Sequence, residues 1–108
     1  MTNRDVLVVT TTHDAEEKAR ALAGLVVRER LAACAQVYPI GSVYWWEGEV
    51  RSASEWRIDF KTTAGLAERL TAFLHEHHGY ETPEVVAVPV VAGSDAYLAW
   101  VVAETAAP

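Results

Sequence analysis

The alternation of apolar and polar positions along the chain predicts four strands. They fall within residues 5–12, 32–50, 55–61 and 83–90. The first is a continuous apolar, β-branched run, which is typical of a strand buried on both faces. The third alternates strictly, so one face is apolar and comprises Trp56, Ile58 and Phe60. Pro39 and Pro89 cannot donate a ladder hydrogen bond, so each predicts a sheet edge, a strand end or a local bend.

Three helices are predicted between and after these strands, within residues 14–32, 62–79 and 95–104. Asp14 and Glu17 have capping-box spacing, and Thr62 or Thr63 and Ser94 are the expected caps of the later two helices. Gly79 is placed to end the second helix. Helical spacing predicts that this helix buries Leu66, Leu70, Phe73, Leu74 and His77.

The resulting order is β-α-β-β-α-β followed by a short C-terminal helix. This is the split βαβ, or ferredoxin-like, α+β pattern. The chain has 108 residues, a usual size for one domain, and we expect a single domain over residues 1–108.

The segment SVYWWEGEV places two tryptophans side by side, and neighbouring side chains of a strand point to opposite faces. With a tight turn at Ser52–Ala53, Trp45 lies opposite Phe60 on the helix-covered face. Trp46 then lies on the bare, polar face, whereas a bulge at Gly48 would exchange the faces of the two rings. An uncovered indole there requires either a stacked ligand or a second subunit, and the pattern favours a subunit. The expected interface comprises Trp46, Tyr44, Arg57, Asp59 and Trp100.

Charge and cysteine content narrow the class of protein. The formal net charge is −6, from 15 acidic and 9 basic residues, which argues against nucleic-acid binding. No apolar run approaches the length of a membrane span, and the N-terminal residues lack a secretory signal pattern. The single cysteine excludes an intramolecular disulfide. We expect a cytoplasmic protein that binds neither nucleic acid nor membrane.

The candidate metal ligands are imidazoles and the thiol, which copper favours. The segment HEHH contains His75, His77 and His78, and Cys34 lies in an apolar run. His75 and His78 can share a helix face, whereas His77 points elsewhere. The alternative is a solvated helix end and a buried, inert thiol.

Five stretches, taken in order, resemble one known family. RLAACAQV, VYWWEGEV, FKTT, EHHGYETPEVVAVPV and YLAW together are similar to the CutA-type divalent-cation tolerance proteins, over Val6 to about Trp100. The resemblance implies a homotrimer similar to the PII signalling proteins, with long hairpins that reach a neighbouring subunit. It also implies a link to divalent metals, copper above all, with His77 and His78 matching a histidine pair of the family.

A second set of polar residues could line a cleft between subunits, namely Glu47, Lys61, Tyr80 and Glu84. By resemblance, a PII-like trimer would hold a small ligand there. The alternative is an ion-pair network that fixes the interface.

Three functions remain open from the sequence. The leading one is a non-enzymatic, homotrimeric metal-tolerance protein that binds copper or another divalent cation through His78, His77 and Cys34. The second is a PII-like module that binds a small anionic metabolite, with Lys61 as its countercharge. The third is an enzyme, for which the sequence offers no catalytic triad, phosphate loop or paired carboxylates.

Overall fold

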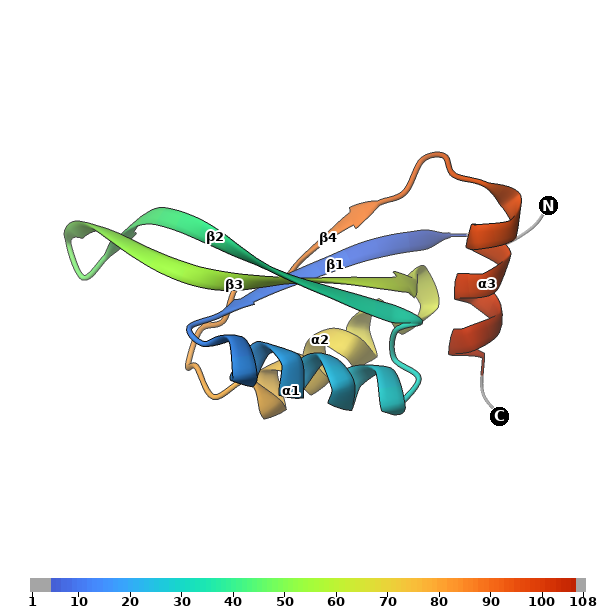
Figure 1. Cartoon of the computed structure of the whole chain (residues 1–108), viewed down its shortest axis with the longest axis horizontal. Coiled ribbons are helices and arrows are strands. Elements are labelled where there is room, and N and C mark those ends of the chain that lie inside the picture. Colours follow the sequence, from blue (N-terminus) through green and yellow to red (C-terminus); the bar gives the residue numbers. More distant parts are fainter. Residues whose placement is uncertain (1–4, 107–108) are drawn as a thin grey trace.

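The computed structural model describes residues 5–106, which form one four-stranded sheet with helices (Figure 1). The strand order is β2-β3-β1-β4, and every neighbouring pair is antiparallel. This is the predicted ferredoxin-like arrangement with a C-terminal helix. The elements in chain order are β1 (Val6–His13), α1 (Glu16–Arg28), β2 (Cys34–Trp46), β3 (Glu49–Thr63), a short 3₁₀ helix (Ala64–Leu66), α2 (Ala67–His77), β4 (Val86–Pro89) and α3 (Asp95–Thr105).

Helices α1 and α2 lie on one face of the sheet, and α3 stands beside one end of it (Figure 1). The core fills the space between the sheet and the first two helices. The strands contribute Val9, Ile58 and Phe60, and α2 contributes Leu70 and Leu74. The predicted apolar face of β3 is confirmed, with Ile58 and Phe60 fully buried and Trp56 packed against the core. No helix among residues 5–106 is long and apolar enough to span a bilayer.

The β2–β3 hairpin is longer than predicted, because its turn is not at Ser52–Ala53. It turns at Glu47 and Gly48, whose φ angles of 53° and 79° are both positive, as a two-residue type I′ turn requires. Residues 51–54, predicted to be a turn, lie inside β3. All 13 residues of β2 therefore pair with residues 49–61 of the 15-residue β3, and the hairpin projects beyond the helices (Figure 1).

The longer hairpin changes the environment of both tryptophans. Trp45 pairs with Val50 and Trp46 with Glu49, so the predicted pairing of Trp45 with Phe60 is wrong. The two rings still lie on the predicted faces of the sheet. The odd-numbered positions of β2 share the face of Ile58 and Phe60, so Trp45 lies on that face and Trp46 on the opposite one. However, no helix reaches this part of the hairpin. Trp45 is 73% exposed and Trp46 is 49% exposed, so both rings lack a cover within the chain.

Several predicted sheet edges and helix ends are confirmed. Pro39 lies in β2 and Pro89 ends β4, and these are the two edge strands of the sheet. Gly79 follows α2 with a φ of 97°, and the Ser94 side chain accepts a hydrogen bond from the backbone N–H of Tyr97 at the start of α3.

Other local predictions are wrong. Helix α1 begins after Ala15 without a side-chain cap, because Asp14 lies beside His13 and Lys18 instead. Thr62 does not cap a helix; its hydroxyl donates to the Leu31 carbonyl at 2.7 Å. The 3₁₀ helix begins after Thr63, which makes no capping bond either.

The prediction that His77 is buried is also wrong. It is exposed and stacks on Phe73 with ring centroids 4.0 Å apart, whereas His78 is the buried residue at the end of the helix. The buried residue at the end of the apolar stripe is His78 and not His77, because α2 ends at His77 and the chain then turns.

Replacing Leu70, which is fully buried, by alanine should lower the free energy of unfolding by about 2–5 kcal/mol, because it leaves a cavity between α2 and the sheet. Val91→Ala is the matched control, since Val91 is 93% exposed and truncating it should change stability by less than about 0.5 kcal/mol. Both are measured by denaturant unfolding at one protomer concentration. Equal effects in the two variants would contradict the described core.

Candidate functional site

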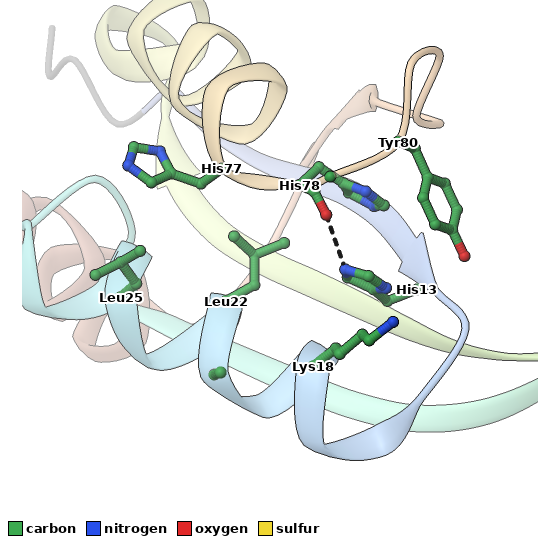
Figure 2. Close-up of a pocket in the computed structure, with 9 residues that line it drawn as sticks. His13, Lys18, Leu22, Leu25, His77, His78 and Tyr80 are labelled. Atoms are coloured by element: carbon green, nitrogen blue, oxygen red, sulfur yellow. Dashed lines mark hydrogen bonds between the residues drawn. The ribbon is translucent and has the colours of Figure 1, made fainter.

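Two buried histidines join the end of β1 to the end of α2. His13 is 6% exposed and His78 is 3% exposed, and their rings stack almost parallel with centroids 4.3 Å apart. Each ring also bonds to the other segment's backbone. His78 Nε2 donates to the Thr12 carbonyl at 2.6 Å, and His13 Nε2 donates to the His78 carbonyl at 3.0 Å (Figure 2). This histidine pair fixes the chain that leads from α2 to β4.

The remaining nitrogen of His78 has no partner. Because Nε2 donates to a carbonyl, Nδ1 carries a lone pair, and this atom is buried without a hydrogen bond among the described residues. Burial lowers the pKa of His78 below its ordinary value of 6.5, and the ring of His13 beside it acts in the same direction. The neutral ring is therefore the form that the fold favours.

His13 Nδ1 lies between two groups of Asp14. The backbone N–H of Asp14 donates to it at 3.1 Å, and the Asp14 carboxylate lies 3.2 Å away. The first contact requires a bare nitrogen and the second a protonated one, so Asp14 can accommodate either state of the ring. Burial is the largest single influence on the pKa of Asp14 and raises it, but the hydrogen bonds and positive charges of Lys18 and His13 together outweigh burial, so the pKa lies below its ordinary value.

A cavity of about 420 Å³ opens beside the histidine pair, between α1 and the end of α2 (Figure 2). Apolar side chains of α1 form one wall, and Lys18 reaches toward His13. Tyr80 packs against both imidazoles, with ring centroids 5.2 Å from His13 and 4.5 Å from His78.

Tyr80 also lines a second and larger cavity, of about 660 Å³, which we call the hairpin cleft. This cleft lies between the projecting hairpin, the end of β1 and residues 80–84. Burial, followed by the nearby carboxylates of Asp14 and Glu55, raises the pKa of Tyr80 above its ordinary value. The phenol therefore stays protonated and can donate a hydrogen bond near neutral pH.

The structure does not bring the predicted metal ligands together within one chain. His78 is buried, whereas His77 points outward and its Nδ1 bonds to the Phe73 carbonyl at 2.9 Å. Cys34 is half-buried at the start of β2, where its sulfur lies 3.3 Å from the Tyr97 hydroxyl. Among the described residues, no three or more His, Cys, Asp or Glu side chains are arranged to hold one ion.

The predicted ligand-binding quartet is likewise divided. Tyr80 and Glu84 both line the hairpin cleft. Glu47 is at the hairpin turn, 3.4 Å from Arg51, and Lys61 lies beside Cys34 in the paired strand and donates to Gln36 at 2.6 Å. A single chain therefore brings only Tyr80 and Glu84 of these four residues together in the hairpin cleft.

The predicted interface residues lie on or beside the uncovered side of the sheet. Tyr44, Trp46 and Trp100 are 40%, 49% and 41% exposed. Asp59 accepts hydrogen bonds from Thr10 at 2.9 Å and Tyr38 at 2.7 Å, and Arg57 lies 3.6 Å from it. The polar centre of this face is thus already ordered within the chain.

The sequence reasoning missed two groups of residues. His13 was not among the candidate residues, although it is buried against His78. The available signal was its place at the end of a strand buried on both faces. Asp14, Glu55 and Glu81 were also missed as lining residues of the hairpin cleft. Only Glu81 had a local signal, because YETPE places it three residues before Glu84.

These features define a small ferredoxin-like α+β protein with a projecting hairpin. The profile of the CutA1 divalent ion tolerance proteins matches residues 6–104. The chain belongs to this family, as its sequence resemblance implied.

Individual relatives agree with this assignment. The chain is 45% identical over 95 residues to protein CutA, chloroplastic, of Arabidopsis thaliana, a match that covers 87% of this chain and 52% of the relative. The chain thus spans about half the length of that plant protein. It is 39% identical over 99 residues to the divalent-cation tolerance protein CutA of Escherichia coli O45:K1, covering 91% of this chain and 88% of the relative.

Solved structures of the family share the fold. CutA from Synechococcus elongatus PCC7942 superposes with a TM-score of 0.92 at 32% identity, covering 98% of this chain and 95% of that one. CutA1 from Oryza sativa gives 0.91 at 39% identity, with 94% of each chain covered.

Acidification should destabilise the fold through His78. The unfolded chain binds a proton near pH 6.5 that the folded ring resists, so the free energy of unfolding should fall as the pH drops below about 6.5, by at most about 1.4 kcal/mol per pH unit for this group. His78→Gln keeps a donor for Thr12 and removes the titrating ring, and should flatten this slope. Denaturant unfolding across the pH range measures it.

The matched control is His75→Gln, which removes an exposed imidazole from the same helix end. Its slope should equal that of the wild type. An unchanged slope in His78→Gln would show that His78 does not govern the acid sensitivity.

Proposed function

We propose that this protein acts as a homotrimer in the cellular response to divalent cations, with copper as the favoured ion and without catalysing a reaction. Membership of the CutA1 family supports the link to divalent cations. The observation that carries the assembly is the apolar hairpin, which projects from the domain with no cover of its own (Figure 1).

The exposed apolar side chains extend from the hairpin across the bare side of the sheet. Val86 and Val88 of the edge strand β4 are 46% and 55% exposed. Each covered indole buries on the order of 150–250 Å², so a few such rings exceed the apolar patch of a few hundred Å² that a monomer usually exposes. The charged pair of Arg57 and Asp59 supplies a fixed polar centre for such an interface.

The number of copies rests on the resemblance to trimeric CutA and PII proteins. The structure of one chain is compatible with it, since the longest dimension is 48 Å and the hairpin can reach past the domain to a neighbour. For the compartment we propose the cytoplasm, because the one cysteine is a free thiol.

A metal site in this assembly would have to combine ligands from more than one copy, because one chain keeps its candidates apart. His77 and Cys34 are the more accessible candidates, and His78 offers its unpartnered Nδ1. Imidazole nitrogen and thiolate are ligands that copper prefers. No observation favours the alternative of an anionic metabolite held by Lys61, since this amine already bonds to Gln36 and lies away from the hairpin cleft.

Trp46→Glu should weaken self-association, because it replaces an apolar ring of the proposed interface with a charge. An aromatic residue at such a position commonly contributes about 2 kcal/mol or more, equivalent to a dissociation constant raised about thirtyfold. Light scattering at several protein concentrations measures the mass. The control is Glu49→Gln, opposite Trp46 on the hairpin. A monomeric wild-type protein would refute the proposal.

Copper, zinc and nickel should bind in a saturable, stoichiometric manner when titrated calorimetrically, with copper the tightest. His77→Ala combined with Cys34→Ser should reduce copper affinity at least tenfold while the oligomer stays intact. His75→Ala is the control for exposed imidazoles. If all variants bind copper as weakly as a surface histidine does, the metal site is excluded and the assembly proposal still stands.

A further inference from the structure

The central strand β3 carries its charges on the bare face of the sheet, which is the side opposite α1 and α2 (Figure 1). Because side chains alternate along a strand, the odd-numbered positions of β3 lie on this face and Ile58 and Phe60 on the other. Acidic and basic side chains alternate in sign along it, with only Ala53 between two of them: Glu49, Arg51, Glu55, Arg57, Asp59 and Lys61. The even-numbered positions of β3 carry no charge.

This row of side chains is neutral as a whole, although the chain carries a formal net charge of −6. A surface of one sign repels a second copy of itself, whereas an alternating row can be shifted along its own copy until opposite charges meet. Nucleic acids favour a basic surface, which this row is not. The charge pattern of the bare face therefore favours another copy of this chain as its partner.

Arg57, in the middle of the row, lacks a hydrogen-bond acceptor. A guanidinium has five N–H donors, and none of them bonds to a residue among 5–106. Its Nε is buried, and Oδ1 of Asp59 lies 3.6 Å from it, which is an ion-pair distance but too long for a hydrogen bond. The side chain is 36% exposed, so the outer edge of the guanidinium is open to a partner on this face.

Asp59, the next residue on the same face, is a fixed acceptor. Its Oδ1 accepts a hydrogen bond from Thr10 at 2.9 Å, and its Oδ2 accepts one from Tyr38 at 2.7 Å. The two oxygens of a carboxylate offer about four acceptor positions, so about two remain open. The carboxylate is thus oriented for the planar fork of an arginine, which can bind both oxygens at once.

Symmetry brings these two positions together. The proposed assembly turns the bare faces of its copies toward one another, so equivalent residues of β3 lie around its axis. Arginines that met arginines there would repel each other. Arg57 and Asp59 are about 7 Å apart along the strand, and a shift by that distance places each Arg57 against the Asp59 of the next copy. The charges then cancel for any number of copies in a closed ring.

We propose that Arg57 of each copy donates hydrogen bonds to the Asp59 carboxylate of the next copy, so that the assembly closes around a ring of alternating charges. The ring rests on the proposed self-association and gives it selectivity. A chain of the same fold without this arginine and this aspartate leaves a charge unpaired in the interface, and such a chain is rejected as a partner.

Charge reversal tests the ring by native mass spectrometry at several protomer concentrations. Arg57→Asp sets two carboxylates against each other and Asp59→Arg two guanidinium groups, so each variant alone should have a dissociation constant raised about thirtyfold or more. Mixing the two variants in equal amounts should restore oligomers that contain both chains, because most interfaces of a mixed trimer then join opposite charges.

Mixing is the decisive step, because Arg57 and Asp59 also face each other within one chain. If their pairing acts only within the chain, every chain in the mixture keeps its defect and mixing restores nothing. Arg57→Gln and Asp59→Asn are a second pair, which removes the charges with less change of structure. Mixing this pair should also strengthen association relative to either variant alone, and circular dichroism checks that each variant is folded.

Arg20→Asp and Glu16→Arg are the matched controls. These two residues form an exposed ion pair on α1, with nitrogen and oxygen 2.9 Å apart, away from the bare face. Alone or mixed, the control variants should have the oligomeric mass of the wild type.

The outcomes separate the ring from the assembly on which it rests. A monomeric wild-type protein would refute the self-association itself. An oligomeric wild type whose mass neither reversal changes would overturn the charge ring alone. The ring is also excluded if both reversals dissociate the oligomer and neither mixture restores it.

Discussion

The reciprocal bonding of His13 and His78 is the constraint on which the organisation of both cavities depends. Helix α2 ends at His77 and β1 ends at His13, and the histidine rings stack where these two ends meet. The two imidazoles satisfy the Thr12 and His78 carbonyls and fill the space between the two segments. They join the turn after α2 to the end of β1, and Tyr80, which packs on both rings, lines both cavities.

This anchor separates a rigid layer from a projecting one. On one side of the histidine pair, α1, α2 and the centre of the sheet enclose the hydrophobic core. Beyond it, β2 and β3 continue as a two-stranded ribbon whose side chains meet no helix. A ribbon of this kind is at most marginally stable by itself, so its order depends on its continuity with the sheet and on whatever covers it. The polar chemistry of the chain is accordingly dispersed, with Cys34 and Lys61 at one end, Glu47 at the turn and the carboxylates in the cleft.

The fold could be predicted from the sequence because its signals are local and consistent. Alternation in residues 55–61, the helical stripe and the glycine after α2 each reflect the geometry of one element. The hairpin register could not be predicted in the same way. Ser52–Ala53 and Glu47–Gly48 are both acceptable turns by composition, and the choice depends on pairing with residues 34–46, which only the folded sheet decides. The error was an even number of residues, so the faces of Trp45 and Trp46 were still correct.

The candidate site was less predictable, because its residues meet only in three dimensions. His78 stood out in the HEHH segment, but its partner His13 lies 65 residues away in sequence. The hairpin cleft joins carboxylates from the residue after β1, from β3 and from the segment after α2, and no spacing rule connects them. Residues that resemble a family motif, such as Tyr80 and Glu84, were found more readily than Asp14 and Glu55, which gain meaning only from the cavity.

Pro39 has a consequence for how chains meet during synthesis. β2 is an edge strand, and its outer side offers unpaired backbone groups along a ribbon rich in aromatic residues, the kind of template on which nascent chains aggregate. A proline in the middle of that edge removes one donor and interrupts the row. Pairing of another strand along this edge is therefore penalised at Pro39, whereas contact through side chains is not.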